Sequence, residues 1–466
     1  MTALAERPRF LYPLAAAAAA VLGAATYVQP RIAFGLVGLL IVVWAAFRHP
    51  VGNLLGLLFL TAVIPYGIQK LAGVSRPGLL PSDLLLIIGV VWSLVAMSRM
   101  KLDRRWLIFG GVLVAYIGWS VLQAVHGYTN GGTPSDIGYE LRIQIGLASF
   151  LIAIPILRDP VRRARLWQGM LVIAVLLGLW GITQYLVTIP FGGAEDFGVR
   201  EGVALTSGGR GQVQGGLYGF GPALIMCAAA LLSGGVTSER ARRWLWIGVL
   251  VNIGGLLFTF ERTFWVAAVL AIGWVVVRAG HAQRVRALIM LPLAAVIALG
   301  VLSVAAPAEF TTARERLLSI GQYTSDNSVR FRVVESRHVV ARIEASPIIG
   351  SGLGTTIYWG QPWQRTPARE VTYTHDGYFW LMWKQGIPAA LVLFGLLAAA
   401  ALLRRPPALP PLERGLRNGA QATLLALLLS SVTFPVVNTL AITAVIGVLL
   451  AIAIVPPRHE APVEIV

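Results

Sequence analysis

Long apolar runs recur along the whole length of the amino-acid sequence. Many of them reach about 17 residues, the length that an α-helix needs to cross roughly 30 Å of hydrocarbon. Only 13% of the 466 residues are charged, against roughly a quarter in an ordinary soluble domain. These features exclude a soluble globular protein and a disordered one. The breaks between the runs predict 14 membrane spans, near residues 11–28, 33–47, 51–68, 83–98, 106–125, 143–157, 167–188, 217–234, 244–260, 263–279, 287–306, 377–402, 419–433 and 437–455.

The expected fold is all-α, a polytopic transmembrane helical bundle that forms a single integral membrane domain over residues 1–466. Three runs, 33–47, 143–157 and 419–433, are short enough to be tilted, re-entrant or merged with a neighbour, so 12 spans is the alternative count. The first run is long and directly followed by another, which predicts a span and not a cleavable signal peptide. The single cysteine, Cys227, lies inside an apolar run and is expected to be a small core residue.

Basic residues give the chain a formal charge of +17 at pH 7. They lie in short connections between apolar runs, a pattern that orients membrane proteins and does not indicate a nucleic-acid-binding surface. With a cytoplasmic N-terminus, the inside segments hold 22 Arg and Lys residues, and the outside loops before residue 307 hold seven. This excess predicts that both termini are cytoplasmic.

One connection is much longer than the others: residues 307–376, which this orientation places outside the cytoplasm. Loops of this length commonly carry function. Within it, the stretch SVRFRVVESRHVVARIEAS, Ser328–Ser346, predicts an amphipathic helix near the membrane surface, ended by Pro347 and the glycines that follow. Two further loops on the same side, 126–142 and the Gly-rich 189–216, are also long.

Charged residues at the outer ends of spans are informative, because an unpaired charge in the membrane needs a compensating interaction. Arg262 lies in a short outside turn next to Glu261. One interpretation is an ion pair at the membrane interface, and the other is a guanidinium whose planar fork of donors binds phosphate. Arg210 lies among glycines in SGGRGQVQGG, where backbone amides and the side chain can approach a phosphate.

Further arginines lie at the same predicted membrane surface. Arg330 and Arg332 begin the predicted loop helix, and Arg337 follows one to two turns later. This basic face is either only solvated or binds an anion. Arg142 opens a span at its outer end, where an interfacial anchor is the competing interpretation.

His375 lies in TYTHDGYFWLMWKQGI, where the long outside segment returns to the membrane. A neutral imidazole accepts a proton from a hydroxyl near pH 7, so His375 is the candidate general base. His338 and His126 are the competing outside histidines, with less support from their neighbours. Aromatic residues nearby, among them Tyr373, suit either the interfacial belt or stacking against sugar rings.

Metal and nucleotide chemistry are poorly supported by the sequence. The outside segments contain no HxxxH, DxD or cysteine cluster, so we expect no metal site and no cofactor. The glycines of GSGLG, residues 350–354, follow no strand–helix unit of the nucleotide-binding kind. They predict a tight loop.

The order of these motifs resembles that of the O-antigen ligase and polymerase family of polytopic membrane glycosyltransferases, from about residue 140 to 400. The resemblance rests on an Arg in a Gly-containing loop (Arg210), a T-x-[SE]-R-like span end (TFER, ending at Arg262) and a long outside loop that opens with an Arg-bearing helix. That loop continues into P-x-x-G-x-G from Pro347 and ends in a His-Asn-like pair followed by aromatic residues and K-x-G-I.

Three positions depart from the family pattern. Glu261 stands where a small residue is usual and is placed to neutralise Arg262 in part. Asp376 replaces the usual Asn and is placed to orient His375 or raise its basicity. Both Arg330 and Arg332 fit the position of the loop-helix arginine.

The resemblance implies a fold similar to the GT-C type glycosyltransferases and transfer of a glycan from an undecaprenyl-diphosphate carrier to an acceptor hydroxyl. The reaction would be inverting and metal-independent, on the periplasmic side of the bacterial inner membrane, and lipid A core would be the acceptor of a ligase. The implied partners are the carrier-linked glycan, the acceptor and membrane lipid, without nucleic acid. The implied site residues are His375 as base, Arg210, Arg262, Arg330, Arg332 and Arg142 for the diphosphate, and Asp376, Tyr373 and Glu261 in support.

Several alternatives remain open at this stage. A polymerase of the same repeat units, or an oligosaccharyltransferase to protein, would use the same residues. A polysaccharide flippase or other transporter would place charges near the bilayer midplane and have balanced loops. A non-catalytic scaffold would not require His375 together with several arginines.

Overall fold

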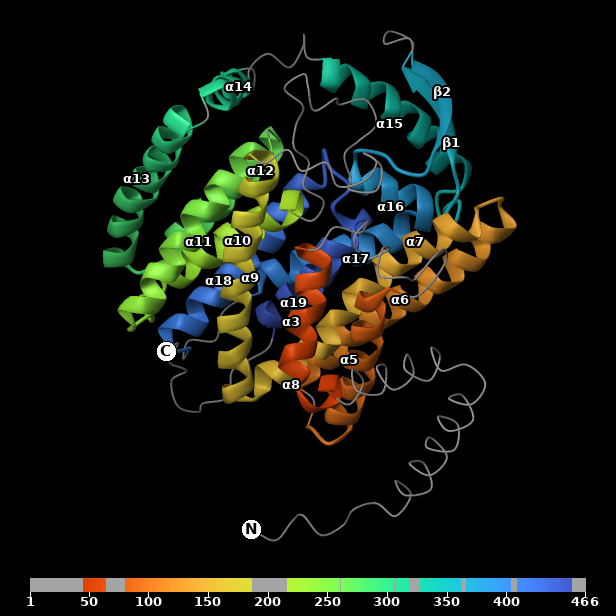
Figure 1. The fold of residues 1–466 in the computed structure, drawn as a ribbon. Coiled ribbons are helices and arrows are strands. Elements are labelled where there is room, and N and C mark those ends of the chain that lie inside the picture. Colours follow the sequence, from red (N-terminus) through yellow and green to blue (C-terminus); the bar gives the residue numbers. More distant parts are fainter. Residues whose placement is uncertain are drawn as a thin grey trace, which may run out of the picture.

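A computed structural model describes residues 45–63, 80–101, 103–186, 216–259, 261–305, 307–318, 327–361, 366–403 and 409–454. These residues form a bundle of helices with one short antiparallel hairpin (Figure 1). The prediction of a mostly helical protein is therefore confirmed. The predicted runs at 11–28 and 33–47 lie outside the described residues, except for the end of the second.

Most helices follow apolar runs of the sequence, with capping residues and prolines at their starts. In chain order the elements are α3 (Pro50–Ala62), α5 (Pro81–Ser98), α6 (Arg104–Thr129), α7 (Pro134–Ile145), η1 (Gly146–Ala148), α8 (Ser149–Arg158), α9 (Pro160–Leu186), α10 (Gly216–Leu232), α11 (Glu239–Phe258), α12 (Arg262–Val277), α13 (His281–Ala305), α14 (Pro307–Leu318), α15 (Asn327–Ala345), β1 (Ile357–Gln361), β2 (Thr366–Val371), α16 (Gly377–Gln385), α17 (Ile387–Leu402), α18 (Pro411–Ser430), η4 (Val436–Asn438) and α19 (Leu440–Ile454).

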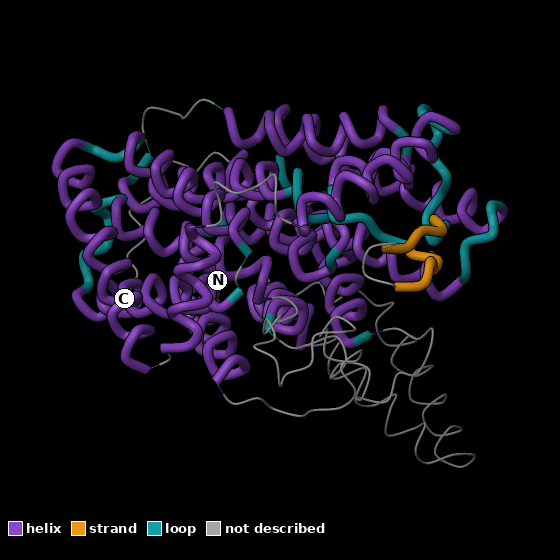
Figure 2. The backbone as a smooth tube through the Cα atoms, turned by 90° about the horizontal axis from the view of Figure 1, so that it is seen from above, coloured by secondary structure: helices purple, strands orange, loops and turns teal. Residues whose placement is uncertain are grey.

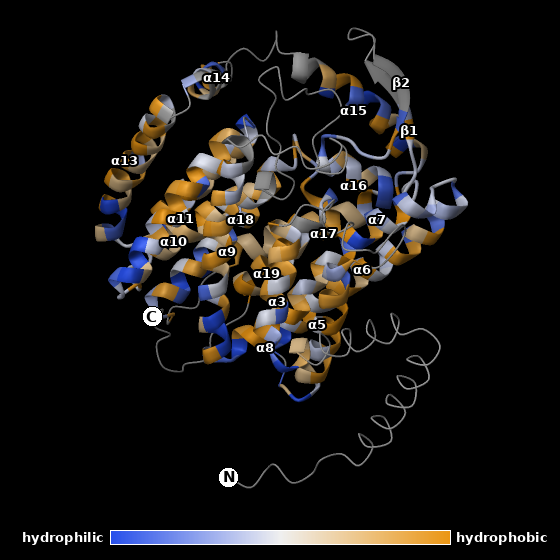
Figure 3. Cartoon of the chain, in the orientation of Figure 1, coloured by the Kyte–Doolittle hydropathy of each residue, from blue (hydrophilic) through white to orange (hydrophobic). Residues whose placement is uncertain are grey.

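Six helical stretches of the described residues are long and apolar enough to cross a membrane. Further helices, among them α12, α17 and α19, are apolar but shorter. Figure 3 shows apolar residues through the middle of the bundle and many polar ones toward its two ends, as expected for helices that cross a bilayer. The six stretches are Pro81–Ser98, Arg104–Thr129, Pro134–Arg158, Pro160–Thr183, Glu239–Phe258 and His281–Val301.

Helix α19 lies inside the bundle because it is apolar on every side. Its residues from Ile446 to Ile454 are buried. It packs closely on α8: Ser149 Oγ donates to the carbonyl of Ala444 at 2.7 Å, and a Cβ at Gly447 would lie 2.2 Å from that same Oγ. Helix α13, by contrast, lies at the edge of the bundle (Figure 1). Most of its apolar side chains are exposed.

Several predicted spans begin earlier in the structure, as α9 does at Pro160 and α18 at Pro411, and two spans differ in more than one end. The run 377–402 is not one helix but two, α16 and α17, because Gly386 between them has a φ of 84°. The run 143–157 begins earlier, at Pro134, and passes through α7, η1 and α8 as one largely buried stretch. The polar start of α7 obscures this helix in the sequence, but Thr133 caps it by accepting the N–H of Asp136.

The long segment 307–376 contains the helix expected at Ser328–Ser346, which is confirmed as α15. It also contains an unpredicted hairpin, in which β1 and β2 pair antiparallel. Helix α15 and the hairpin lie at the same end of the bundle, near α16 (Figure 1). Seen from above, the hairpin lies at one edge of the helices (Figure 2).

The glycine-rich loop after α15 attaches this segment to the bundle through backbone contacts. The N–H groups of Ser351 and Gly352 donate to the carbonyls of Trp383 (2.7 Å) and Lys384 (3.0 Å) at the end of α16. Gly352 has a φ of 92°, and a Cβ there would lie 2.3 Å from the backbone nitrogen of Gly127 on α6. The predicted tight loop is confirmed, and its glycine allows an approach that a side chain would block.

The break between α16 and α17 generates a stability prediction. Gly386→Ala is expected to lower the free energy of unfolding by more than about 2 kcal/mol, because alanine is strained at positive φ and the new Cβ would clash. That Cβ would lie 2.0 Å from the carbonyl oxygen of Ile348. Thermal unfolding of the purified protein in detergent measures the loss. Gly395→Ala in α17 is the control, since a Cβ there meets nothing within 4 Å, and equal melting temperatures for the two variants would contradict the prediction.

Candidate functional site

His375 lies between the hairpin and α16 and is held by Glu335 of α15. The backbone N–H of His375 donates to Glu335 Oε2 at 2.9 Å. The ring Nδ1 lies 3.0 Å from both carboxylate oxygens. The side chains are 7% and 2% exposed, respectively. The Glu335 carboxylate contacts both the backbone N–H and the ring of His375, so the position and orientation of the imidazole are fixed.

Aromatic rings complete the surroundings of His375. Phe331 contacts the imidazole edge to face with 5.1 Å between ring centroids, and Tyr373 does so at 5.6 Å. Phe331 and Glu335 are four residues apart on α15 and therefore share one face of that helix. The structure thus brings the predicted residues His375 and Tyr373 together.

The contact with Glu335 determines what the imidazole can do. A carboxylate at Nδ1 accepts a hydrogen bond from the ring N–H there and leaves Nε2 as the basic nitrogen, the arrangement in which a histidine acts as a general base. The carboxylate would also stabilise the imidazolium that forms when Nε2 takes up a proton.

Sequence reasoning missed Glu335, although a signal for it is present. Phe331, Glu335, Val339 and Ile343 recur every four residues, and the last three are buried, at 2%, 0% and 8% exposure. Glu335 is thus an acidic residue within the apolar stripe of a helix in which arginines outnumber acidic residues. A carboxylate in such a position requires a partner, and His375 provides it.

Asp376 caps α16 in the structure. Its Oδ1 accepts the backbone N–H of Phe379 at 2.9 Å. Burial raises the pKa of the Asp376 carboxyl above its usual value, and the nearby charge of Glu335 raises it further, while backbone N–H groups of α16 oppose both effects. The carboxylate of Glu335 contacts the His375 ring, so the orienting role expected of Asp376 has a second candidate.

Arg332 and Arg337 of α15 line an open groove of about 630 Å³. Phe379 of α16 and Thr433 line its other side. Arg332 and Ser336 follow Phe331 and Glu335 directly in the chain, so the groove lies on the face of α15 next to the one that holds His375. This end of the bundle therefore combines a histidine–carboxylate pair with a neighbouring groove whose charged lining residues are Arg332, Arg337 and Glu344.

Arg262 is brought to the same region by the turn 431–435. Arg262 is the first residue of α12, and Glu261 before it is buried at 7% exposure. The hydroxyl of Thr433 donates to that of Thr263 at 2.7 Å. On the other side of the turn, the N–H of Gly377 donates to the carbonyl of Ser431 at 2.7 Å. One turn thus contacts the starts of α12 and α16.

The remaining predicted arginines are placed differently. Arg210 lies outside the described residues. Arg330 belongs to α15, but the structure does not describe its side chain. Arg142 of α7 binds the carboxylate of Asp83, with Nε 2.9 and 3.0 Å from its two oxygens. This ion pair connects α7 with α5.

The two competing histidines have other contacts. His338 is exposed on α15, and its Nδ1 lies 2.9 Å from the carbonyl of Val334 one turn earlier. His126 of α6 has its Nε2 3.3 Å from the carbonyl of Gly350. Among the described residues, no group of three or more His, Cys, Asp or Glu side chains is arranged to hold a metal ion.

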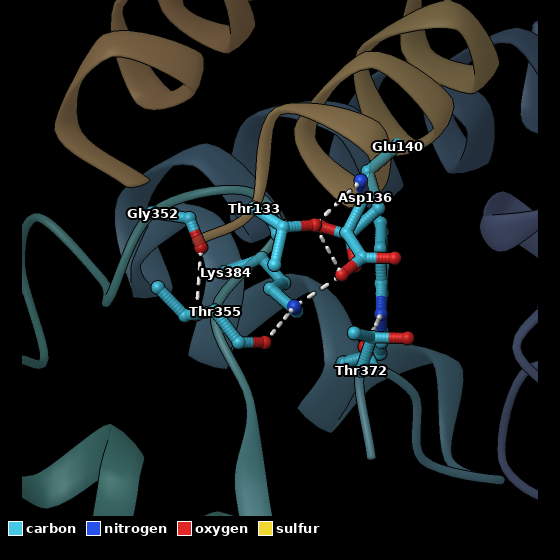
Figure 4. A network of polar contacts seen from close by, with 9 residues as sticks. Thr133, Asp136, Glu140, Gly352, Thr355, Thr372 and Lys384 are labelled. Atoms are coloured by element: carbon cyan, nitrogen blue, oxygen red, sulfur yellow. Dashed lines mark hydrogen bonds and ion pairs between the residues drawn. The ribbon is translucent and has the colours of Figure 1, made fainter. Parts of the chain in front are cut away.

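A buried ion pair fixes the far end of α16. Lys384 Nζ lies 2.9 Å from Glu140 Oε1 of α7, and the two side chains are 0% and 3% exposed. Lys384 also donates to the carbonyl of Thr355 (Figure 4). The N–H of Gly354 donates to Glu140 Oε2 at 2.7 Å. The lysine of K-x-G-I and the loop that follows P-x-x-G-x-G therefore meet in one network.

Residues 247–394 match the family model described as O-antigen ligase. The match runs from within α11 to within α17 and includes Arg262, Arg332, Glu335, His375 and Lys384. It confirms the predicted resemblance over this region and supports a membrane enzyme of the ligase or polymerase type. A search of curated proteins finds no match.

The Lys384–Glu140 network generates a second stability prediction. Lys384→Met is expected to lower the free energy of unfolding by about 3–5 kcal/mol, because it leaves Glu140 buried without its cation. The double variant with Glu140→Gln should regain much of this loss, since no uncompensated charge remains. Thermal unfolding of the single and double variants measures the coupling. If the two single losses simply add in the double variant, the ion pair does not contribute as described.

Proposed function

Because residues 247–394 match the O-antigen ligase family, we propose that this protein is a membrane glycosyltransferase. It transfers a glycan from an undecaprenyl-diphosphate carrier to an acceptor hydroxyl on the periplasmic side of the bacterial inner membrane, with lipid A core as the acceptor. The observation that carries the proposal is the buried contact of His375 with Glu335 beside a groove lined by arginines.

In the proposed reaction, His375 Nε2 accepts the proton of the acceptor hydroxyl. The hydroxyl oxygen attacks the anomeric carbon of the carrier-linked glycan, and the bond from that carbon to the diphosphate oxygen breaks. The electron pair leaves with the diphosphate, and attack opposite the leaving group inverts the anomeric centre. Glu335 keeps Nδ1 protonated and stabilises the imidazolium during the transfer.

The arginines stabilise the charge that develops on the diphosphate. Arg332 and Arg262 carry this part of the proposal, because both lie around the turn 431–435 near the start of α16. Guanidinium groups suit the task, since their donors match phosphate oxygens in pairs. Cations placed in this way supply electrostatic stabilisation without a metal ion. Arg210, Arg330 and Arg142 complete the proposed set.

The same proposal covers the orientation of the chain. The charge bias of the connections supports cytoplasmic termini and a periplasmic site. A polymerase or a protein oligosaccharyltransferase of the same family would use the same donor and differ in the acceptor. Transfer assays with lipid A core, a carrier-linked glycan or a peptide as acceptor distinguish the three.

Loss of the histidine or its partner should reduce turnover. His375→Ala and Glu335→Gln are each expected to lower kcat by about 10²–10⁴-fold with little effect on the KM for the donor. Purified full-length protein, carrier-linked glycan and acceptor in EDTA provide the assay. The matched controls are His338→Ala, on α15 like Glu335, and Glu315→Gln on α14. Both should keep wild-type activity. Undiminished turnover of His375→Ala would refute its role as base.

Loss of an arginine should weaken donor binding. Arg332→Ala and Arg262→Ala are each expected to raise the KM for the carrier-linked glycan by about 10–100-fold, because a charged hydrogen bond to phosphate is lost. Arg332→Lys should recover only part of the loss, since an ammonium lacks the planar fork. Arg314→Ala in α14, where the side chain is exposed, is the control. An unchanged KM for both alanine variants would remove them from the diphosphate site.

A further inference from the structure

A small polar cavity lies at the opposite end of the bundle from α15. Its volume is about 30 Å³, and its lining comes from the end of α8, the starts of α9 and α18, and the end of α19. Helices α8 and α15 lie at opposite ends of the bundle (Figure 1). Along α18, the rise from Arg417 of this cavity to the turn 431–435 is about 20 Å. The cavity is therefore separate from the arginine-lined groove of α15.

Two arginines and one glutamate line this cavity, namely Arg163, Arg417 and Glu413. Arg163 Nη2 lies 2.8 Å from Glu413 Oε1, and the two side chains are 6% and 9% exposed. Arg163 Nη1 donates to the carbonyl of Leu157 at 3.2 Å. Arg417, one turn after Glu413 on α18, is 3% exposed. The lining thus carries one positive charge more than negative charges, in a buried place where charged groups require compensation.

The same lining contains hydrogen-bond donors that lack an acceptor. Among the described residues, Arg163 Nε and Trp167 Nε1 are buried and have no hydrogen-bond partner. The two residues are four apart on α9 and therefore share one face of that helix. Buried N–H groups are normally bonded. The cavity exceeds the roughly 10–15 Å³ that one oxygen-sized group needs. It therefore has room for an acceptor, and its positive lining favours an anionic one.

We propose that this cavity binds a phosphate group, whose oxygens accept hydrogen bonds from Trp167 Nε1 and from the guanidinium groups of Arg163 and Arg417. Guanidinium donors match phosphate oxygens in pairs, and the indole N–H adds a donor that has no competing acceptor function. The inference is independent of the proposed transfer reaction, because it concerns the other end of the bundle and none of the residues proposed for catalysis.

Two sources can supply the phosphate group: the headgroup of a phospholipid and free phosphate. Trp167 also lines an apolar cavity of about 100 Å³ beside α3 and α10, and so does Leu416, the neighbour of Arg417. A phospholipid bound through its phosphate could place hydrocarbon in that apolar cavity, whereas inorganic phosphate would use the polar cavity alone. Both present the same oxygens to the arginines, so the test includes both.

The test titrates full-length protein in a neutral detergent with inorganic phosphate and measures the Kd by calorimetry. Trp167→Phe keeps an aromatic ring but removes the N–H, and it should raise the Kd by about tenfold or more, because a hydrogen bond to a charged group is lost. Trp180→Phe is the matched control on the same helix. Its Nε1 is likewise buried without a partner among the described residues, but Trp180 is not part of this lining, so the Kd should stay at the wild-type value.

Nanodiscs of phosphatidylcholine with and without phosphatidylglycerol provide the lipid arm, with the melting temperature as readout. A rise caused by phosphatidylglycerol in the wild type and in Trp180→Phe, but not in Trp167→Phe, supports the site and identifies a headgroup as its ligand. The same pattern with inorganic phosphate alone supports the site with free phosphate as ligand. The proposal is overturned if the wild type responds to neither ligand, or if the two tryptophan variants respond equally. Weaker phosphate binding in Arg332→Ala, with wild-type binding in Trp167→Phe, would place the phosphate in the groove of α15 and also overturn it.

Discussion

The burial of Glu335 is the constraint on which the arrangement of α15 and α16 depends. A carboxylate in the apolar stripe of α15 needs a compensating group, and it finds two on His375, the backbone N–H and the ring. The contact docks α15 against the start of α16 and at the same time fixes the imidazole. In the proposed reaction, the packing of α15 and the chemistry therefore rely on the same pair of side chains.

The far end of α16 is fixed by a different kind of interaction. Lys384 and Glu140 join α16 to α7, and the loop at Gly352 approaches both α16 and α6 through its backbone. Helix α16 is short, so its position depends on these two attachments more than on its own propensity. Motifs that are separated in the sequence are close in space because each supplies one part of this attachment.

Much of the helical bundle could be predicted from the sequence, because runs such as 83–98 and 106–125 have the length and polarity that a bilayer requires. The break at Gly386 could not, since apolar runs tolerate glycine and proline without losing their signal. The start of α7 was hidden by its polar residues. For the site, the place of His375 at the end of the long loop favours it over His338 and His126 in the sequence, and its catalytic role stays a prediction. The four-residue spacing of Phe331, Glu335, Val339 and Ile343 is visible in the sequence, but only the structure shows that this face of α15 is buried against His375.

The rotation of helix α15 about its own axis is also constrained. Phe331 and Glu335 face His375, while Arg332 and Ser336, each one residue later, line the groove. Successive residues of a helix are rotated by about 100° from one another. A rotation of α15 about its axis by the angle of one residue would turn Glu335 away from the imidazole and Arg332 out of the groove together. The positions of Glu335 and Arg332 are thus coupled, because no rotation of α15 about its axis can move one of them without the other.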